Sequence, residues 1–97
     1  MNEREHLLVL LMEEASEVIK ATSKALRFGL LDSYPDYADG KPNWRVIREE
    51  LHDLVGVVEM LNDDVCDLLP FDRDLIEAKK CKVLKFIKHA RANGAIS

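Results

Sequence analysis

The sequence has few of the residues that interrupt or crosslink a chain, with four Gly, three Pro and two Cys among 97 residues. Glycine and proline are the strongest breakers of regular structure, so their scarcity leaves long uninterrupted segments that favour helices. The apolar fraction of 47% beside 33% charged residues is ordinary for a folded globular protein and excludes an intrinsically disordered chain. We expect a single domain that covers residues 1–97.

The sequence also lacks segments that would direct it to a membrane or out of the cell. It has no run of about 18 apolar residues, and residues 1–6 carry acids without the basic-then-apolar order of a signal peptide. Cys66 and Cys81 lack the spacing of a zinc site, so we expect two reduced, partly buried thiols in a cytoplasmic protein. The net charge of −4 gives no general reason to expect nucleic acid as a partner.

Three segments have apolar residues spaced three and four apart, as along one face of a helix. Gly29 follows the first segment and tolerates a left-handed C-cap, and Asn43 is a suitable N-cap for the second. Pro70 stops the second helix, and Asp72 can cap the third. The predicted helices cover residues 3–28, 44–69 and 73–92.

The predicted fold class is therefore all-α, with three long helices in each chain. Helices of this length, each with a broad apolar stripe, do not bury themselves well alone. We expect a helical bundle that is completed by homodimerisation, and a tetramer is the alternative assembly.

A loop of turn-forming residues, about 29–43, separates the first two predicted helices. It carries Tyr34 and Tyr37, and Trp44 stands at its exit. These rings either pack at a hinge or form a stacking surface for a planar ligand. Packing is the stronger expectation for Trp44, because the tyrosines have polar neighbours.

Glu50 is the most informative residue of the second predicted helix. It projects about 40° from Leu54, inside the apolar stripe of the helix rather than opposite it. Asp53, three residues further on, lies at the edge of the same stripe. A carboxylate on a buried face costs several kcal/mol unless it is paired or holds a metal, so Glu50 requires a partner.

The first predicted helix supplies further carboxylates, because Glu14 and Glu17 border its apolar face. Two antiparallel helices joined by one loop would bring four carboxylates together, and a hard divalent cation, Mg²⁺ or Mn²⁺, would relieve their repulsion. The alternative is that these acids are solvated and pair with cations such as Lys20. This alternative applies most to Glu13, which points furthest from the core. The four converging carboxylates are Glu14, Glu17, Glu50 and Asp53.

Basic residues accompany these acids. Lys79 falls at the centre of the apolar face of the third predicted helix, with Lys82 on its flank. Such a lysine either extends its stem to solvent or reaches a negative group inside. Lys24 and Arg27 lie at the end of the first helix, on the side that carries Glu17. Carboxylates can hold a metal ion, and basic side chains further away can bind phosphate groups. This combination suits a polyphosphate that is chelated to the metal.

A second metal pattern is present but is disfavoured by its geometry. Glu3-x-x-His6 and Glu49-x-x-His52 match the Glu-x-x-His spacing of di-iron bundles. His52, however, projects about 170° from the centre of its helix's apolar stripe, which puts it in solvent. His6 lies in the first turn of its helix.

The order Glu13-Glu14-x-x-Glu17 and then Glu50-x-x-Asp53 resembles the signature of the MazG-like, all-α nucleoside triphosphate pyrophosphohydrolases. The run from Lys24 to Gly29 adds to the resemblance, which covers about residues 7–90. The chain is similar above all to the short, single-domain members that are common in phages and bacteria. A phage-encoded member would act in the host cytoplasm.

The resemblance implies that Glu14, Glu17, Glu50 and Asp53 bind Mg²⁺, for which Mn²⁺ can substitute, and that Glu13 is a further ligand or orients water. It implies water attack on the α-phosphorus of a nucleoside triphosphate, which releases a monophosphate and pyrophosphate. Basic side chains would hold the phosphates, and the 29–43 loop would cover the base. The implied phosphate-binding residues are Lys24, Arg27, Lys79 and Lys82, and the implied base-stacking residues are Tyr34, Tyr37 and Trp44.

Two hypotheses follow. The first is a metal-dependent pyrophosphohydrolase, and the second is a non-catalytic helical dimer whose basic C-terminal helix docks on an acidic partner. Both account for three helices and a dimer. Only the first accounts for Glu50 and Lys79 on apolar faces, and neither identifies the preferred base or sugar.

Overall fold

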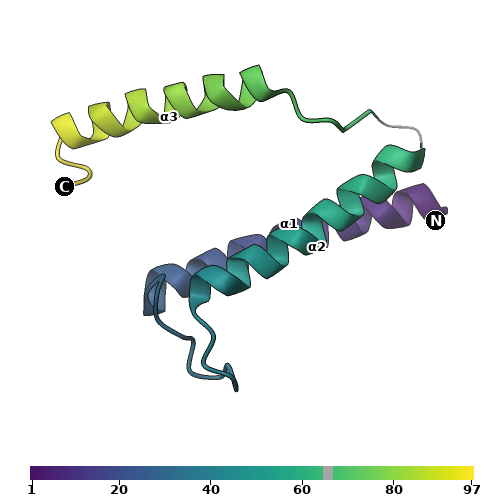
Figure 1. Cartoon of the computed structure of the whole chain (residues 1–97), viewed down its shortest axis with the longest axis horizontal. Helices are drawn as coiled ribbons and strands as arrows, with labels where there is room; N and C mark the ends of the chain where they lie inside the picture. Colours follow the sequence, from purple (N-terminus) through teal and green to yellow (C-terminus); the bar gives the residue numbers. More distant parts are fainter. Residues whose placement is uncertain (65–66) are drawn as a thin grey trace.

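The computed structural model describes residues 1–64 and 67–97 of the chain. These residues form three α-helices and no strand: α1 spans Glu3–Phe28, α2 spans Asn43–Asp64 and α3 spans Arg73–Ala92. α1 and α2 lie side by side and antiparallel as a helical hairpin, and α3 runs apart from them (Figure 1). The predicted all-α class and the three helices are confirmed.

α1 has well-defined signals at both ends, and its predicted bounds are confirmed. The Asn2 side chain accepts a hydrogen bond from the backbone N–H of Glu5 at 2.8 Å, and the Asn2 N–H donates to the Glu5 carboxylate at 3.3 Å. This capping box satisfies two backbone donors that the first helical turn leaves unpaired. The helix ends at Gly29, whose φ of 99° is in the region that glycine tolerates and whose N–H donates to the Ala25 carbonyl at 2.9 Å.

Asn43 does not cap α2 with its side chain, so that prediction is wrong. The Asn43 side chain is fully buried, and its Nδ2 donates to the Gly29 carbonyl at 2.8 Å. Its backbone N–H donates to the Asp32 carbonyl, also at 2.8 Å, while its Oδ1 accepts no hydrogen bond from the described residues. Asn43 therefore ties the two ends of the 29–43 loop together rather than satisfying the first turn of α2.

The C-terminal end of α2 was predicted too late. The helix ends at Asp64, residues 67–72 are not helical, and Val65 and Cys66 lie outside the described residues. The residue before a proline is disfavoured in the helical region, and here the Leu69 N–H donates to the Asn62 side chain at 2.8 Å instead of to a helical carbonyl. The apolar spacing continues to Leu68, so periodicity alone did not reveal this end.

The core lies in the seam between α1 and α2 and is small. Its buried apolar residues are Leu7, Ala21, Ala25, Val46 and Leu61. The two alanines face α2 from the second half of α1, where small side chains let the helix axes approach closely. The loop is secured to this hairpin by Lys41, whose Nζ lies 3.1 Å from the Glu49 carboxylate.

α3 has its predicted bounds, 73–92, and its predicted cap. The Asp72 side chain accepts hydrogen bonds from the backbone N–H groups of Asp74 and Leu75. Among the described residues, however, α3 packs against neither α1 nor α2, and it buries none of its own residues. Cys81 is exposed, so the partial burial predicted for it is wrong. No helix in the described ranges combines the length and the apolar character that a membrane crossing requires.

Gly29→Ala is predicted to destabilise the chain. An added Cβ would lie 2.8 Å from the Asp32 Oδ2, in a backbone conformation with a φ of +99°. Such strain costs on the order of 1–3 kcal/mol, to be measured as a loss in the free energy of unfolding in urea.

Gly56→Ala is the matched control, because Gly56 lies within α2 and an added Cβ would meet nothing within 4 Å. Glycine inside a helix is less favourable than alanine, so this change should raise the free energy of unfolding by about 0.5–1 kcal/mol. Equal effects of the two substitutions would show that Gly29 has no special backbone role.

Candidate metal centre

Three carboxylates meet where α1 and α2 pass each other. Glu14 of α1 and Glu50 and Asp53 of α2 each contribute one oxygen, and these oxygens all lie within 4.8 Å of one another. Glu50 and Asp53 are three residues apart, so they lie one above the other on one side of α2. The antiparallel hairpin then places the middle of α1 opposite them. We call Glu14, Glu50 and Asp53 the acidic cluster.

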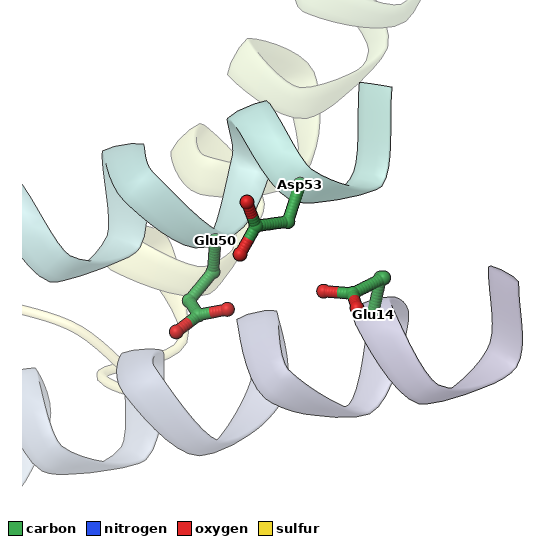
Figure 2. Close-up of side chains that lie close together, drawn as sticks. All are labelled: Glu14, Glu50 and Asp53. Atoms are coloured by element: carbon green, nitrogen blue, oxygen red, sulfur yellow. The ribbon is translucent and has the colours of Figure 1, made fainter. Parts of the chain in front are cut away.

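The three carboxylates turn into the space between the two helices (Figure 2). Glu14 and Glu50 are half-buried and Asp53 is exposed. The sequence predicted Glu50 on a buried face, so its burial is less than expected. The acidic cluster is therefore a partly solvated site at the edge of the seam, which a soluble ligand can reach.

The surroundings of Glu50 in the acidic cluster disfavour the ionised form of its carboxyl group. The pKa of Glu50 is raised above its ordinary value of 4.5, first because burial removes water from the carboxylate and then because Asp53 and Glu17 lie nearby. The carboxylates of Glu14 and Glu49 raise the pKa of Glu50 further. A proton or a cation at this point would remove the repulsion.

The remaining predicted acids lie outside the cluster. Glu17 is close enough to raise the pKa of Glu50, but its own carboxylate lies 3.8 Å from Lys20 Nζ in an exposed pair. Glu13 is exposed, as is His52. The solvent position predicted for His52 is therefore confirmed. The structure joins Glu14, Glu50 and Asp53 and leaves Glu17 one helical turn away.

The predicted basic residues lie in two separate places. Lys24 Nζ is 4.3 Å from the centre of the Tyr34 ring, and the Arg27 guanidinium lies 5.2 Å from the ring of Phe28. Lys79 and Lys82 belong to α3, which in the described residues contacts neither helix of the hairpin. One chain therefore does not bring these two lysines to the acidic cluster.

The aromatic residues of the loop pack differently from the prediction. The rings of Phe28 and Tyr34 meet edge to face with their centroids 5.1 Å apart, and Tyr37 lies 5.2 Å from Tyr34. Trp44, for which packing was the stronger expectation, is 43% exposed. The sequence analysis did not include Phe28 in this group of aromatic rings. Its position at the end of α1, six residues before Tyr34, could have indicated the contact.

The donor set fits a hard divalent cation. Oxygens bound to one octahedral Mg²⁺ at about 2.0–2.1 Å lie about 2.9 Å apart in adjacent positions and about 4.2 Å apart in opposite ones, so the three oxygens, now within 4.8 Å, need to approach one another by up to about 2 Å. Rotation of half-exposed side chains can supply that movement. Carboxylate ligands without Cys or His favour Mg²⁺ or Mn²⁺ over softer metals.

Comparisons of this chain with protein-family models, with curated proteins and with solved structures find no match. The MazG-like resemblance therefore stays a prediction from the motif residues. The geometry of the acidic cluster is independent of that resemblance.

Glu50→Gln is predicted to stabilise the metal-free protein. The pKa of Glu50 is higher in the folded chain than the unfolded value of about 4.5, so the folded state binds its proton more tightly. The free energy of unfolding of the parent protein should therefore fall as the pH rises from about 4.5 through the raised pKa. Glu50→Gln should remove this pH-dependent loss of stability. At neutral pH in EDTA, its midpoint of thermal unfolding should therefore be a few degrees higher than that of the parent protein.

Glu49→Gln is the control for this prediction. Glu49 precedes Glu50 but pairs with Lys41 and Arg45, at 3.1 and 3.5 Å. Its removal should bring no comparable gain. A Glu50→Gln protein that is no more stable than the parent at neutral pH would show that the acidic cluster carries little repulsion.

Proposed function

We propose that this protein is a divalent-metal-dependent nucleoside triphosphate pyrophosphohydrolase of the MazG-like kind, acting as a homodimer. The observation that carries the proposal is the approach of Glu14, Glu50 and Asp53 oxygens to within 4.8 Å between α1 and α2. These residues come from the two acidic motifs on which the resemblance rests. The motif and the geometry therefore support the same function from separate starting points.

In this proposal the acidic cluster holds Mg²⁺ or Mn²⁺, with Glu17 as the fourth predicted ligand. The bound metal would neutralise charge on the phosphate oxygens and on the leaving pyrophosphate. Glu13 would position the attacking water and accept its proton. The new bond joins the water oxygen to the α-phosphorus, and the bond from that phosphorus to the bridging oxygen breaks, so the products are a nucleoside monophosphate and pyrophosphate.

The loop end of the hairpin suits the nucleoside part of the substrate. Lys24 lies seven residues beyond Glu17, which is about 10 Å along α1. Its ammonium group is 4.3 Å from the Tyr34 ring centre and 5.7 Å from that of Tyr37. Lys24 and Arg27 would hold phosphates, and the two tyrosines would stack on the base. Lys79 and Lys82 would take part only if the dimer brings an α3 to the acidic cluster.

A non-catalytic interaction module is the second candidate. It is favoured by α3, which carries seven Lys or Arg against two Asp or Glu over residues 73–92 and leaves its apolar residues uncovered. Such a helix could dock on an acidic partner. A screen of common and modified nucleoside triphosphates, with products identified as monophosphate plus pyrophosphate or as diphosphate plus phosphate, separates the two candidates.

Glu50→Ala and Asp53→Ala are each predicted to lower pyrophosphate release by at least about 100-fold, because each removes a charge that holds the metal. Glu59→Ala is the matched control, since Glu59 is an exposed acid of α2 about 180° around the helix from Glu50. Its activity should equal that of the parent. Full activity of either cluster variant would refute the proposed enzyme.

Mg²⁺ is predicted to raise the thermal unfolding midpoint of the parent protein. A ligand that binds only the folded state, at a hundredfold excess over its Kd, stabilises that state by about 2.7 kcal/mol. For a chain of this size the corresponding rise in the midpoint is roughly 10–20 °C. EDTA should reverse the shift, and Asp53→Asn should abolish it while Glu59→Gln retains it. An equal shift in all three proteins would mean that the metal binds elsewhere.

A further inference from the structure

We propose that Asn43 recognises the base of the substrate, with its Oδ1 accepting a hydrogen bond from an exocyclic amino group. The preferred substrates are then nucleoside triphosphates of cytosine, adenine or guanine. Uracil, thymine and hypoxanthine lack such a group and are disfavoured. The inference rests on the proposed function and names its substrate class. Its basis is the one buried polar side chain among the described residues.

The carboxamide of Asn43 is held in one orientation. Its Nδ2 donates to the Gly29 carbonyl at 2.8 Å, and a carbonyl oxygen can only accept, so the amide nitrogen must lie on that side. The Oδ1 therefore points away from Gly29, and none of the described residues donates a hydrogen bond to it. The backbone is fixed too, because the Asn43 N–H donates to the Asp32 carbonyl at 2.8 Å. Asn43 is thus an oriented acceptor that lacks a donor.

A buried acceptor without a donor limits the chemistry of what can bind to it. Buried polar groups in folded proteins are almost always hydrogen-bonded, so an exception calls for a partner from outside the chain. An amide oxygen can take an N–H or O–H donor, but it repels the oxygens of phosphate, carboxylate and carbonyl groups. In a nucleotide substrate, the exocyclic amino group of a base is a donor of this kind.

Asn43 lies where the base of a bound nucleotide is expected. It precedes Glu50 by seven residues, so both side chains leave α2 on nearly the same line, about 10 Å apart along the helix axis. Because the antiparallel seam sets Glu50 against Glu14, it sets Asn43 against residues 21–25 of α1. With the α-phosphate at the acidic cluster, this interval along the seam leaves room for the ribose between the metal and the base.

Tyr34 supplies a stacking surface close to Asn43. The Tyr34 ring packs against Phe28, and the next residue, Gly29, holds the Asn43 carboxamide. The Lys24 ammonium group lies 4.3 Å from the centre of the Tyr34 ring. A polyphosphate would attract this ammonium group, and a base would then take its place on the ring with one edge toward the seam.

The cover over Asn43 is thin. It includes the backbone of Gly29 and Asp32, which belong to the loop, and every loop residue from 29 to 42 is exposed or half-buried. Segments with few buried contacts open at a low cost in free energy. Only the amino edge of a base has to reach the Oδ1, so a small displacement of the loop is sufficient.

A single buried acceptor distinguishes amino bases from keto bases. The seam beside Asn43 has the buried residues Ala21, Ala25 and Val46, whose side chains offer no donor. A carbonyl oxygen in place of the amino group would face the Oδ1 and stay unpaired. The ring N–H of uracil or hypoxanthine is no substitute, because the carbonyl beside it would be buried without a donor. Sites that hydrogen-bond a substrate group discriminate strongly against analogues that lack it.

Steady-state kinetics with matched substrates test the inference. The pairs are dCTP with dUTP, and dATP or dGTP with dITP, which carries hypoxanthine. In every pair that the parent protein hydrolyses, kcat/KM should favour the amino base at least about tenfold. Asn43→Leu keeps a similar side-chain volume without the acceptor, so its ratio should fall to about one. Asn62→Leu is the matched control, because Asn62 bonds the Leu69 N–H at the other end of α2 and its loss should leave the ratio unchanged.

A second variant and a binding measurement separate base recognition from the loop contact. Asn43→Asp keeps an acceptor oxygen but loses the amide donor to Gly29, so it should retain the amino preference while Asn43→Leu loses it. Without hydrolysis, dCMP should raise the thermal unfolding midpoint of the parent protein more than dUMP does, and dAMP more than dIMP. Circular dichroism checks folding. If Asn43→Leu is unfolded, the parent ratios and Asn43→Asp decide.

Equal or inverted kcat/KM values within the hydrolysed pairs would overturn the inference and leave the proposed hydrolysis intact. An internal water would then be the donor to the Oδ1. A preference that persists in Asn43→Leu would also overturn it, because another group would then recognise the base. If no triphosphate is hydrolysed, the proposed function fails, and equal midpoint shifts with the paired monophosphates would show that the base recognition fails with it.

Discussion

Close packing of α1 against α2 is the constraint on which the rest of the structure depends. It is the only helix–helix contact in the described part of the chain, and it buries nearly all of the core. The same contact holds Glu14 against Glu50 and Asp53, which repel one another. Apolar burial along the seam therefore stabilises a local arrangement that electrostatics opposes, and a proton or a cation at the acidic cluster would relieve the repulsion.

The hairpin also divides the surface by chemistry. The acidic cluster lies at the edge of the seam, and large apolar residues such as Ile19 and Leu51 are exposed elsewhere on the two helices. Two antiparallel helices of 26 and 22 residues bury only one line of side chains each, so both outer sides remain available.

Much of the local structure could be predicted because its causes are local. The bounds of α1 and α3 follow from apolar spacing together with Gly29 and Asp72, and both are confirmed. The role of Asn43 was missed because it depends on a hydrogen bond to Gly29, which lies 14 residues earlier in the chain. The end of α2 was missed because the apolar spacing continues past the helix to Leu68. Periodicity marks which residues can lie on a helical face, but it does not show where a distant donor or acceptor will be.

The sequence by itself determined that the chain is helical and that Glu50 and Asp53 share a side of α2, because these properties need only a repeat of about 3.6 residues per turn. Only the tertiary structure decided that Glu14 rather than Glu17 completes the acidic cluster, since the register of two helices depends on how their side chains interlock. It also separated Lys79 from that cluster. The position of a helix relative to others is a non-local property, and no spacing within α3 encodes it.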